Sequence, residues 1–282
     1  MSFEEKALTF LCAGKKLVGV LSRPAAVASR GVIVVVGGPQ YRVGSHRQFL
    51  MLSRDLAAVG IPVLRFDYRG MGDSEGEMRS FESIDEDLAA AIDVFFAHLP
   101  ELHEVILWGL CDAASAALMY AHRDPRVCGL VLANPWVRTP EGLAHTMIKH
   151  YYGARLLQGA FWRSLLRGRI DVAEACRDLG ANLGALLRKQ ARHPSASAST
   201  PFQDRMALGL QRFTGNVLIC LSGNDLTARE FEAATSASAT WKDALDRPKL
   251  QWRRLAESNH TFSKRAWRDQ VSSWTTDWMR SW

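Results

Sequence analysis

The stretch VILWGLCDAASAALMYA, residues 105–121, decides the fold of this chain. Its apolar first part favours a strand that ends near Gly109, and its alanine-rich second part favours a helix. Cys111 stands at the turn between them. A Gly-x-nucleophile-x-small turn raises one side chain at the N-terminus of the helix, and small residues at Gly109 and Ala113 let strand and helix pass closely. The spacing predicts that Cys111 is a nucleophile.

Segments on both sides of this turn alternate between strand and helix patterns. Helices are predicted at 45–60, with Ser45 as the N-cap, and at 83–99. Strands are predicted around them at 15–24, 31–39, 61–70, 104–110 and 127–135. Alternation of this kind indicates an α/β fold with a mainly parallel sheet and helices on both faces.

The alternation is interrupted after residue 136. Residues 137–212 carry helical patterns rich in Arg, Leu and Ala, broken by the loop-like RHPSASASTP at 192–201. Strand and helix patterns then return at 216–225, 228–245 and 249–258, before a terminal helix with four tryptophans. We therefore expect a core made of residues 1–136 and 213–282, with a helical lid at 137–212 inserted into it.

The composition excludes several classes of protein. The chain has 282 residues, 48% of them apolar, which suits a folded globular protein. It has no run of about 18 apolar residues, so no membrane span is expected. The acidic start lacks the pattern of a signal peptide, so a cytoplasmic location is expected. The net charge of +6 attracts anions, but no nucleic-acid-binding motif accompanies it, and no nucleic acid is expected as a partner.

The five cysteines form no C-x-x-C pair. An odd count without such spacing argues against a disulfide framework or a zinc site, and neither a metal nor a cofactor is expected. Buried packing roles are predicted for the cysteines in strand-like or helical runs, which are Cys12, Cys128, Cys176 and Cys220. The cysteine at the strand-to-helix turn is the one whose position favours chemistry.

Two further loops carry side chains that suit a nucleophile. Reactive groups gather beyond the carboxyl ends of the strands in a parallel sheet. Asp225 lies in SGND after one predicted strand, and His260 lies in SNHTF after the last one. In this arrangement His260 takes the proton of the nucleophile and Asp225 fixes the imidazole tautomer, with Glu257 as the alternative to Asp225. The predicted catalytic residues are Cys111, Asp225 and His260.

The order of nucleophile, acid and histidine, with the three loop positions, resembles the α/β hydrolases that carry a lid between the sixth and seventh core strands. This resemblance covers residues 1–135 and 213–282. More narrowly, the chain is similar to the exosortase A system-associated hydrolase 1 family, found beside genes for exopolysaccharide production and exosortase-type protein sorting. The similar stretches are VVGGPQYRVGSHRQF, RFDYRGMGDSEGE and WGLCDAASAALMYA. The resemblance implies that Asp67 is a structural turn acid, and it supplies no substrate.

This sequence departs from the serine pattern at two positions, since Cys111 replaces the usual serine and Ala113 the last glycine of the turn. A thiol is intrinsically more nucleophilic and is partly ionised near neutral pH. The helix N-terminus and an imidazolium favour the thiolate, whereas the negative charge of Asp112 disfavours it. His260 is therefore expected to lie close enough to Cys111 to outweigh Asp112. The alternative is a packing cysteine in a protein that has lost activity.

The oxyanion of a tetrahedral intermediate needs backbone donors placed in advance. One is expected from the N–H of Asp112, which follows the nucleophile. Pro39 has no N–H and cannot serve. The sequence GGPQ resembles the His-Gly-Gly-Pro-Gly turn of some peptidases in the superfamily, which implies that Gly38 donates and that Gln40 borders the site. Val36 stands where that motif has its histidine.

These features predict a hydrolase or thioesterase that acts on an ester or thioester acyl group through a covalent acyl-cysteine. If a hydroxyl or an amine replaces water as the acceptor, the protein is an acyltransferase, with coenzyme A or an acyl carrier protein as the donor. A third alternative is a non-catalytic binding protein. Basic residues near the turn and in the lid predict an anionic donor, and those expected to bind it are Arg42, Arg47, Arg163 and Arg167.

Overall fold

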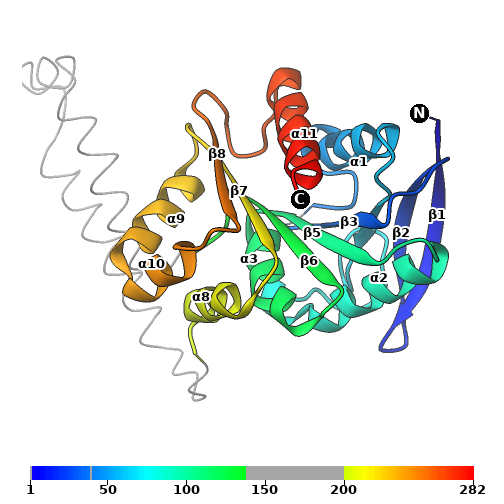
Figure 1. Ribbon diagram of the computed structural model, residues 1–282. Coiled ribbons are helices and arrows are strands. Elements are labelled where there is room, and N and C mark those ends of the chain that lie inside the picture. Colours follow the sequence, from blue (N-terminus) through cyan, green and yellow to red (C-terminus); the bar gives the residue numbers. More distant parts are fainter. Residues whose placement is uncertain (1, 39, 138–199) are drawn as a thin grey trace, which may run out of the picture. The chain divides into compact units, whose positions relative to one another are not determined.

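The computed structural model describes residues 2–38, 40–137 and 200–282. In this part of the chain eight strands form one sheet in the order β1-β2-β4-β3-β5-β6-β7-β8. The strands are β1 (Phe3–Cys12), β2 (Lys15–Pro24), β3 (Arg30–Val35), β4 (Val63–Asp67), β5 (Glu104–Leu110), β6 (Val127–Ala133), β7 (Asn216–Ser222) and β8 (Leu250–Leu255). β1 pairs antiparallel with β2 and β2 antiparallel with β4, while the remaining neighbours are parallel (Figure 1). The expected α/β fold with a mainly parallel sheet is confirmed.

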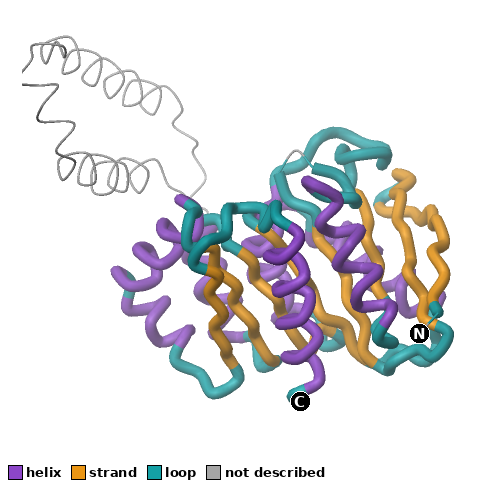
Figure 2. The backbone as a smooth tube through the Cα atoms, turned by 90° about the horizontal axis from the view of Figure 1, so that it is seen from above, coloured by secondary structure: helices purple, strands orange, loops and turns teal. Residues whose placement is uncertain are grey.

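Helices cover both faces of this sheet (Figure 1). They are α1 (Gln48–Ala58), α2 (Asp85–His98), α3 (Asp112–Tyr120), α8 (Phe202–Arg212), α9 (Leu226–Ala237), α10 (Ala239–Leu245) and α11 (Arg265–Arg280). Buried residues of α1 and α11 share one apolar cluster, and those of α2, α3 and α8 share the other. Figure 2 shows the strands side by side in the sheet that separates them.

Strand β3 explains why its sequence is apolar without interruption. Val32 and Val34 pack into the cluster on the α1 side, whereas Ile33 and Val35 pack into the cluster on the α2 side. Successive side chains of a strand point to opposite faces, so a strand covered on both faces must be apolar at every position. β3 therefore lies in the interior of the protein. The loop that follows it begins at the carboxyl edge of the sheet.

Two predicted elements differ in detail from the structure, and one strand of the structure was not predicted. Ser45 does not cap a helix; it opens a 3₁₀ turn, and α1 begins at Gln48 after Arg47, whose φ is 59°. The helix predicted at 228–245 is two helices, because Ser238 ends α9 and its Oγ accepts a hydrogen bond from the Trp241 N–H of α10. Strand β1 was not predicted as an element, since polar residues fill much of its exposed face.

Helix α8 lies in the part of the chain that the sequence assigned to the insert, 137–212. The structure instead groups residues 1–138 and 201–282 in one compact unit. Met206, Ala207 and Leu210 are fully buried, and a Cβ on Gly209 would lie only 2.3 Å from the Leu118 carbonyl oxygen. α8 therefore crosses α3 closely and belongs to the core. The remainder of the expected lid lies outside the described residues.

Truncating the buried face of α8 should destabilise the fold. Met206→Ala should lower the free energy of unfolding by about 2–5 kcal/mol, because it leaves a cavity against α3. Leu208→Ala is the matched control on the same helix, since Leu208 is 37% exposed, and it should cost about 0.5 kcal/mol or less. Chemical denaturation of both variants measures the difference, and equal losses would contradict the packing of α8 on the core.

Candidate active site

Cys111 lies between the last residue of β5 and the first residue of α3. Its backbone has φ 63° and ψ −127°, a conformation that costs free energy for a residue with a side chain. Hydrogen bonds on both sides hold it there. The Cys111 N–H donates to the Ala133 carbonyl at 2.9 Å, and the Cys111 carbonyl accepts from the Trp136 N–H at 3.2 Å. The turn between strand and helix that the sequence predicted is present, and its backbone is strained.

The glycine before this turn permits the close crossing. A Cβ on Gly109 would lie 2.6 Å from the carbonyl carbon of Ala113 and 2.6 Å from the Ala114 nitrogen. Real Cβ atoms do not approach backbone this closely, so a side chain at Gly109 would force α3 away from β5. Gly109 thus fixes where the N-terminus of α3, and with it Cys111, stands over the sheet.

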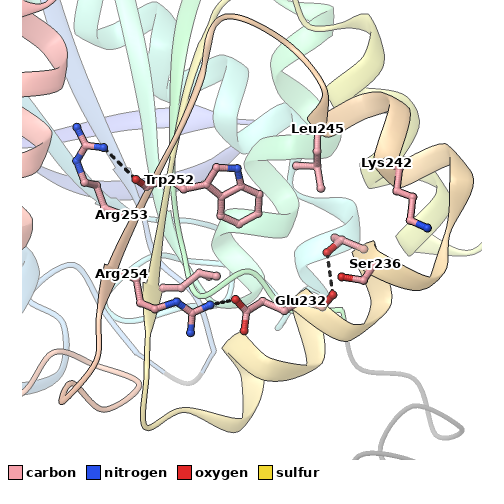
Figure 3. A pocket seen from close by; sticks show the side chains of 9 residues that line it. Glu232, Ser236, Lys242, Leu245, Trp252, Arg253 and Arg254 are labelled. Carbon is pink, nitrogen blue, oxygen red and sulfur yellow. Dashed lines mark hydrogen bonds and ion pairs between the residues drawn. The ribbon is translucent and has the colours of Figure 1, made fainter.

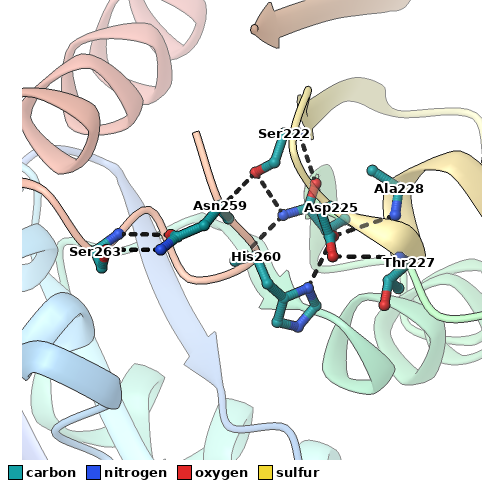
Figure 4. Close-up of polar contacts among 8 residues, drawn as sticks. Ser222, Asp225, Thr227, Ala228, Asn259, His260 and Ser263 are labelled. Atoms are coloured by element: carbon teal, nitrogen blue, oxygen red, sulfur yellow. Dashed lines mark hydrogen bonds and ion pairs between the residues drawn. The ribbon is translucent and has the colours of Figure 1, made fainter. Parts of the chain in front are cut away.

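Asp225 and His260 lie next to each other at the carboxyl edge of the sheet (Figure 4). Asp225 is the N-cap of α9, and its two carboxylate oxygens accept the N–H groups of Thr227 and Ala228, each at 3.2 Å. Its Oδ2 also accepts from His260 Nδ1 at 2.8 Å. Because Nδ1 faces the carboxylate, Nε2 is the ring nitrogen left for Cys111, and the electrostatic interaction of the Cys111 thiol with the imidazole places the two side chains near each other. The structure therefore brings the three predicted residues together.

The charge of the imidazole follows from these neighbours. Burial lowers the pKa of His260, but the hydrogen bonds and negative charges of Asp225 and Cys111 outweigh burial and raise the pKa to about 10. The imidazolium form therefore persists through neutral pH, and it pairs with the carboxylate on one side and with the sulfur on the other.

A buried amide supports the two loops that carry the acid and the histidine. Asn134, which follows β6, is fully buried and has φ 42°. Its Nδ2 donates to Ser222 Oγ and to the His260 carbonyl, both at 2.9 Å, and its Oδ1 accepts the Ser222 N–H at 2.8 Å. Ser222 Oγ in turn donates to the Asn259 carbonyl at 2.9 Å. Asn134 and Ser222 were not predicted, and the one sequence signal was a polar residue at the end of each apolar strand.

Asp112 occupies an unexpected position. Its Oδ2 accepts the Gly38 N–H at 3.0 Å, so the backbone donor predicted for the oxyanion already binds a carboxylate of the protein. Gly37 makes room for this carboxylate, because a Cβ there would lie 2.2 Å from Asp112 Oδ1. Burial raises the pKa of Asp112, although N–H groups of the surrounding backbone and the charge of His260 oppose it.

The polar residues expected to bind substrate have different surroundings. The Arg42 guanidinium forms ion pairs with Asp67 and Asp73, and Asp67 also accepts the N–H of Arg42 at 2.6 Å and that of Asp73 at 3.1 Å. Asp67 is thus the structural turn acid that the resemblance implied. Gln40 Oε1 accepts the Ser45 N–H at 3.1 Å. Arg47 is exposed, whereas the lid arginines at 163 and 167 lie outside the described residues.

The remaining described cysteines differ from Cys111. Burial raises the pKa of Cys128 and of Cys220 to about 12, and it also raises the pKa of Cys12. These thiols are therefore protonated at neutral pH and serve as packing groups, as the sequence predicted. Cys176 lies outside the described residues. Within residues 2–38, 40–137 and 200–282, no group of three or more His, Cys, Asp or Glu side chains is placed to hold a metal ion.

A hollow on the surface of the same compact unit lies apart from the three predicted catalytic residues. It has a volume of about 610 Å³ and is lined mainly by side chains of α9, α10 and β8, among them Glu232, Lys242, Trp252 and Arg254 (Figure 3). Glu232 and Arg254 form an ion pair across it. None of the three predicted catalytic residues lines this hollow, so its location gives no support for acyl chemistry there.

No helix in the described ranges combines the length and the apolar character that are needed to cross a membrane.

Removing the charge of Asp225 should change His260. Burial lowers the pKa of His260 and Asp225 raises it, so Asp225→Asn should bring the pKa well below 10 and slow any acyl chemistry by about 10⁴-fold. An NMR pH titration of the His260 ring measures the first effect. Glu257→Gln is the control, because Glu257 is exposed and only its backbone carbonyl bonds to Asn224. A larger effect from Glu257→Gln would mean that Glu257 orients the imidazole.

Comparisons with known proteins agree with this architecture. The esterase Pf2001 of Pyrococcus furiosus superposes with a TM-score of 0.65 at 16% identity, covering 99% of this chain and 93% of that chain. Est1E from Butyrivibrio proteoclasticus, solved with ferulic acid bound, gives 0.64 at 15% identity, covering 98% of each chain. A putative hydrolase from Agrobacterium vitis S4 gives 0.60 at 16% identity, covering 99% of each chain. At these identities the likeness establishes the α/β-hydrolase fold.

The family assignment comes from sequence. No curated protein sequence matches the chain. Residues 28–225 match the family described as serine aminopeptidase, S33, which is more than half of the chain and includes Cys111 and Asp225. The chain therefore belongs to the serine aminopeptidase S33 family of α/β hydrolases, with a cysteine at the turn where the family name denotes a serine.

Proposed function

We propose that the protein cleaves an ester or thioester through a covalent acyl intermediate on Cys111. The observation that carries this proposal is the grouping of Cys111, His260 and Asp225: His260 hydrogen-bonds to Asp225 and interacts electrostatically with the thiol, which stands on a strained turn. A nucleophile, a base within hydrogen-bond reach and a group that orients the base are the requirements for nucleophilic acyl transfer. A cysteine kept only for packing would not need this arrangement.

The proposed reaction has two steps. The Cys111 thiolate attacks the acyl carbonyl carbon and forms a tetrahedral intermediate, which collapses to acyl-Cys111 as the bond to the leaving oxygen or sulfur breaks. His260 donates its Nε2 proton to that leaving group. Neutral His260 then takes a proton from water, the resulting hydroxide attacks the thioester, and the acid departs as the thiolate–imidazolium pair is restored.

Asp112 has two opposing roles in this proposal. Its N–H is one expected oxyanion donor, while its carboxylate occupies the other donor, Gly38. A developing oxyanion and a carboxylate repel each other and cannot share one N–H. The Asp112 side chain must therefore leave Gly38 before the carbonyl oxygen of the substrate can bind there.

A transferase is the second candidate, because a cysteine nucleophile forms a thioester intermediate. Transfer of an acyl group from a thioester to a hydroxyl or an amine is energetically favourable, whereas exchange between two thioesters is nearly balanced. Coenzyme A or an acyl carrier protein would then be the donor, with Arg47, Arg163 and Arg167 as candidates to bind its anionic groups.

Intact-protein mass spectrometry tests the proposed function. The full chain is exposed to acyl thioesters of different chain length and to a small activated ester. The expected result is a mass gain of one acyl group that maps to Cys111, with faster loss when a hydroxyl or amine acceptor is added if the protein is a transferase. Failure of every acyl donor to label Cys111, together with slow alkylation by iodoacetamide, would instead support a non-catalytic binding protein.

Substitutions at Cys111 separate the nucleophile from its surroundings. Cys111→Ala should abolish turnover without changing the unfolding midpoint by more than a few degrees. Cys111→Ser should retain a small fraction of the activity, because a hydroxyl depends on its base more strongly than a thiol does. Steady-state kinetics and thermal unfolding are the measurements. Near-normal rates in Cys111→Ala would exclude the covalent mechanism.

Freeing Gly38 should accelerate the reaction. One oxyanion donor is worth about 10²–10³ in kcat, so Asp112→Ala should raise the rate of Cys111 acylation by up to about 10²-fold. Asp112→Asn is the matched control, because an amide of the same shape still fills the space beside Gly37 and should give a smaller gain. Stopped-flow acylation with a small activated ester measures both. A clear loss of rate in Asp112→Ala would mean that the carboxylate assists the chemistry.

A further inference from the structure

A small cavity lies next to the loop that carries His260, and Phe262 of this loop lines it. Its volume is about 20 Å³, and its walls come from α1, β5, α11 and the residue two positions after His260, Phe262. A cavity needs about 10–15 Å³ to hold one water-sized guest. The space therefore suits a single atom or a single small molecule, and it is too small for an anion with four oxygens.

Three residues that line this cavity each have a side-chain nitrogen donor without a partner. Gln48 Nε2, Trp108 Nε1 and Arg268 Nε are each buried, and each lacks a hydrogen-bond acceptor among the described residues. The Gln48 and Trp108 residues are only 6% and 3% exposed. Buried donors without acceptors are rare and costly, and three of them around one cavity point to an occupant that accepts several hydrogen bonds at once.

The cavity also carries a positive charge that nothing on its walls neutralises. The Arg268 guanidinium donates through Nη1 to the His46 carbonyl at 2.7 Å, and it forms no ion pair with a carboxylate of the described chain. Asp55 does not line the cavity, and its carboxylate accepts a hydrogen bond from the Oγ of the lining residue Ser272 at 2.8 Å. An occupant with a negative charge would satisfy the donors and balance the guanidinium together.

We propose that this cavity binds one small monovalent anion of the size of chloride, held by Gln48, Trp108 and Arg268. The bound anion joins the four parts of the chain that line the cavity, two of which lead to predicted catalytic residues. Trp108 lies three positions before Cys111 on β5, and Phe262 holds a left-handed backbone conformation, φ 48°, on the loop of His260. Binding to the folded state alone stabilises that state by mass action, so the site should make stability depend on the halide concentration.

Thermal unfolding and crystallography test the site directly. The full chain is unfolded in sodium chloride, in sodium bromide and in sodium gluconate at one fixed ionic strength. Chloride and bromide should raise the unfolding midpoint by at least about 2 °C over gluconate, whose anion cannot enter the cavity. Crystals grown with bromide should show an anomalous peak between Gln48, Trp108 and Arg268.

Variants separate the anion from a water molecule. Gln48→Glu supplies a carboxylate to the other two donors, so it should raise the midpoint in gluconate and remove both the halide response and the bromide peak. Trp282→Phe is the matched control, because Trp282 Nε1 is also buried and unpaired but lies outside the cavity, and this variant should keep the halide response. A water molecule with the Gln48 amide turned, seen as a cavity without a bromide peak, would overturn the proposal, as would a halide response that survives in Gln48→Glu.

Discussion

Cys111 can hold its backbone in a left-handed conformation only because β6 and the residues after it bind its peptide groups on both sides. The N–H is fixed by Ala133 and the carbonyl by Trp136, while Gly109 lets α3 approach β5. If any of these contacts were lost, the residue could relax and the thiol would turn away from His260. The parallel sheet therefore determines the position of the sulfur. The packing of β3, β5 and β6 fixes the orientation of the Cys111 side chain.

The electrostatics of the site depend on one imidazole among three acidic groups. His260 binds Asp225 directly and contacts the Cys111 thiol, and its charge also acts on Asp112. One positive charge cannot neutralise a thiolate and two carboxylates, so the resting site is negative once all three are ionised. That excess opposes a further negative charge at the carbonyl oxygen of a substrate. In the proposed mechanism, displacement of Asp112 from Gly38 removes this excess where the oxyanion forms, so the reaction requires a change in the side-chain conformation of Asp112.

Local patterns were sufficient for most of the strands, whose sequences carry recognisable runs. The runs at 15–24 and 104–110 coincide with β2 and β5, and the positions of Asp225 and His260 followed from the strands before them. The partly exposed β1 has no comparable run, and the amphipathic α8 could not be told from an insert helix without knowing what it packs on. The Asn134–Ser222 network depends on the register that sets Ala133 beside Cys220 across two strands. The contact of Asp112 with Gly38 depends on a rotamer, which no sequence pattern encodes.

In the proposed mechanism, the substitution of cysteine for serine changes the role of the histidine. In a serine site the imidazole is neutral at rest and removes the hydroxyl proton during attack. Here burial lowers the pKa of His260, while Asp225 and Cys111 raise it to about 10, so the proton is already on the ring before the substrate binds. Acylation converts the sulfur to a neutral thioester and removes one of the two groups that raise this pKa. The pKa of His260 then falls, and the imidazole that gave its proton to the leaving group becomes able to take one from the acceptor. In this proposal His260 Nε2 thereby serves as the acid in the first step and as the base in the second, and the loss of the negative charge on the sulfur drives the change of role.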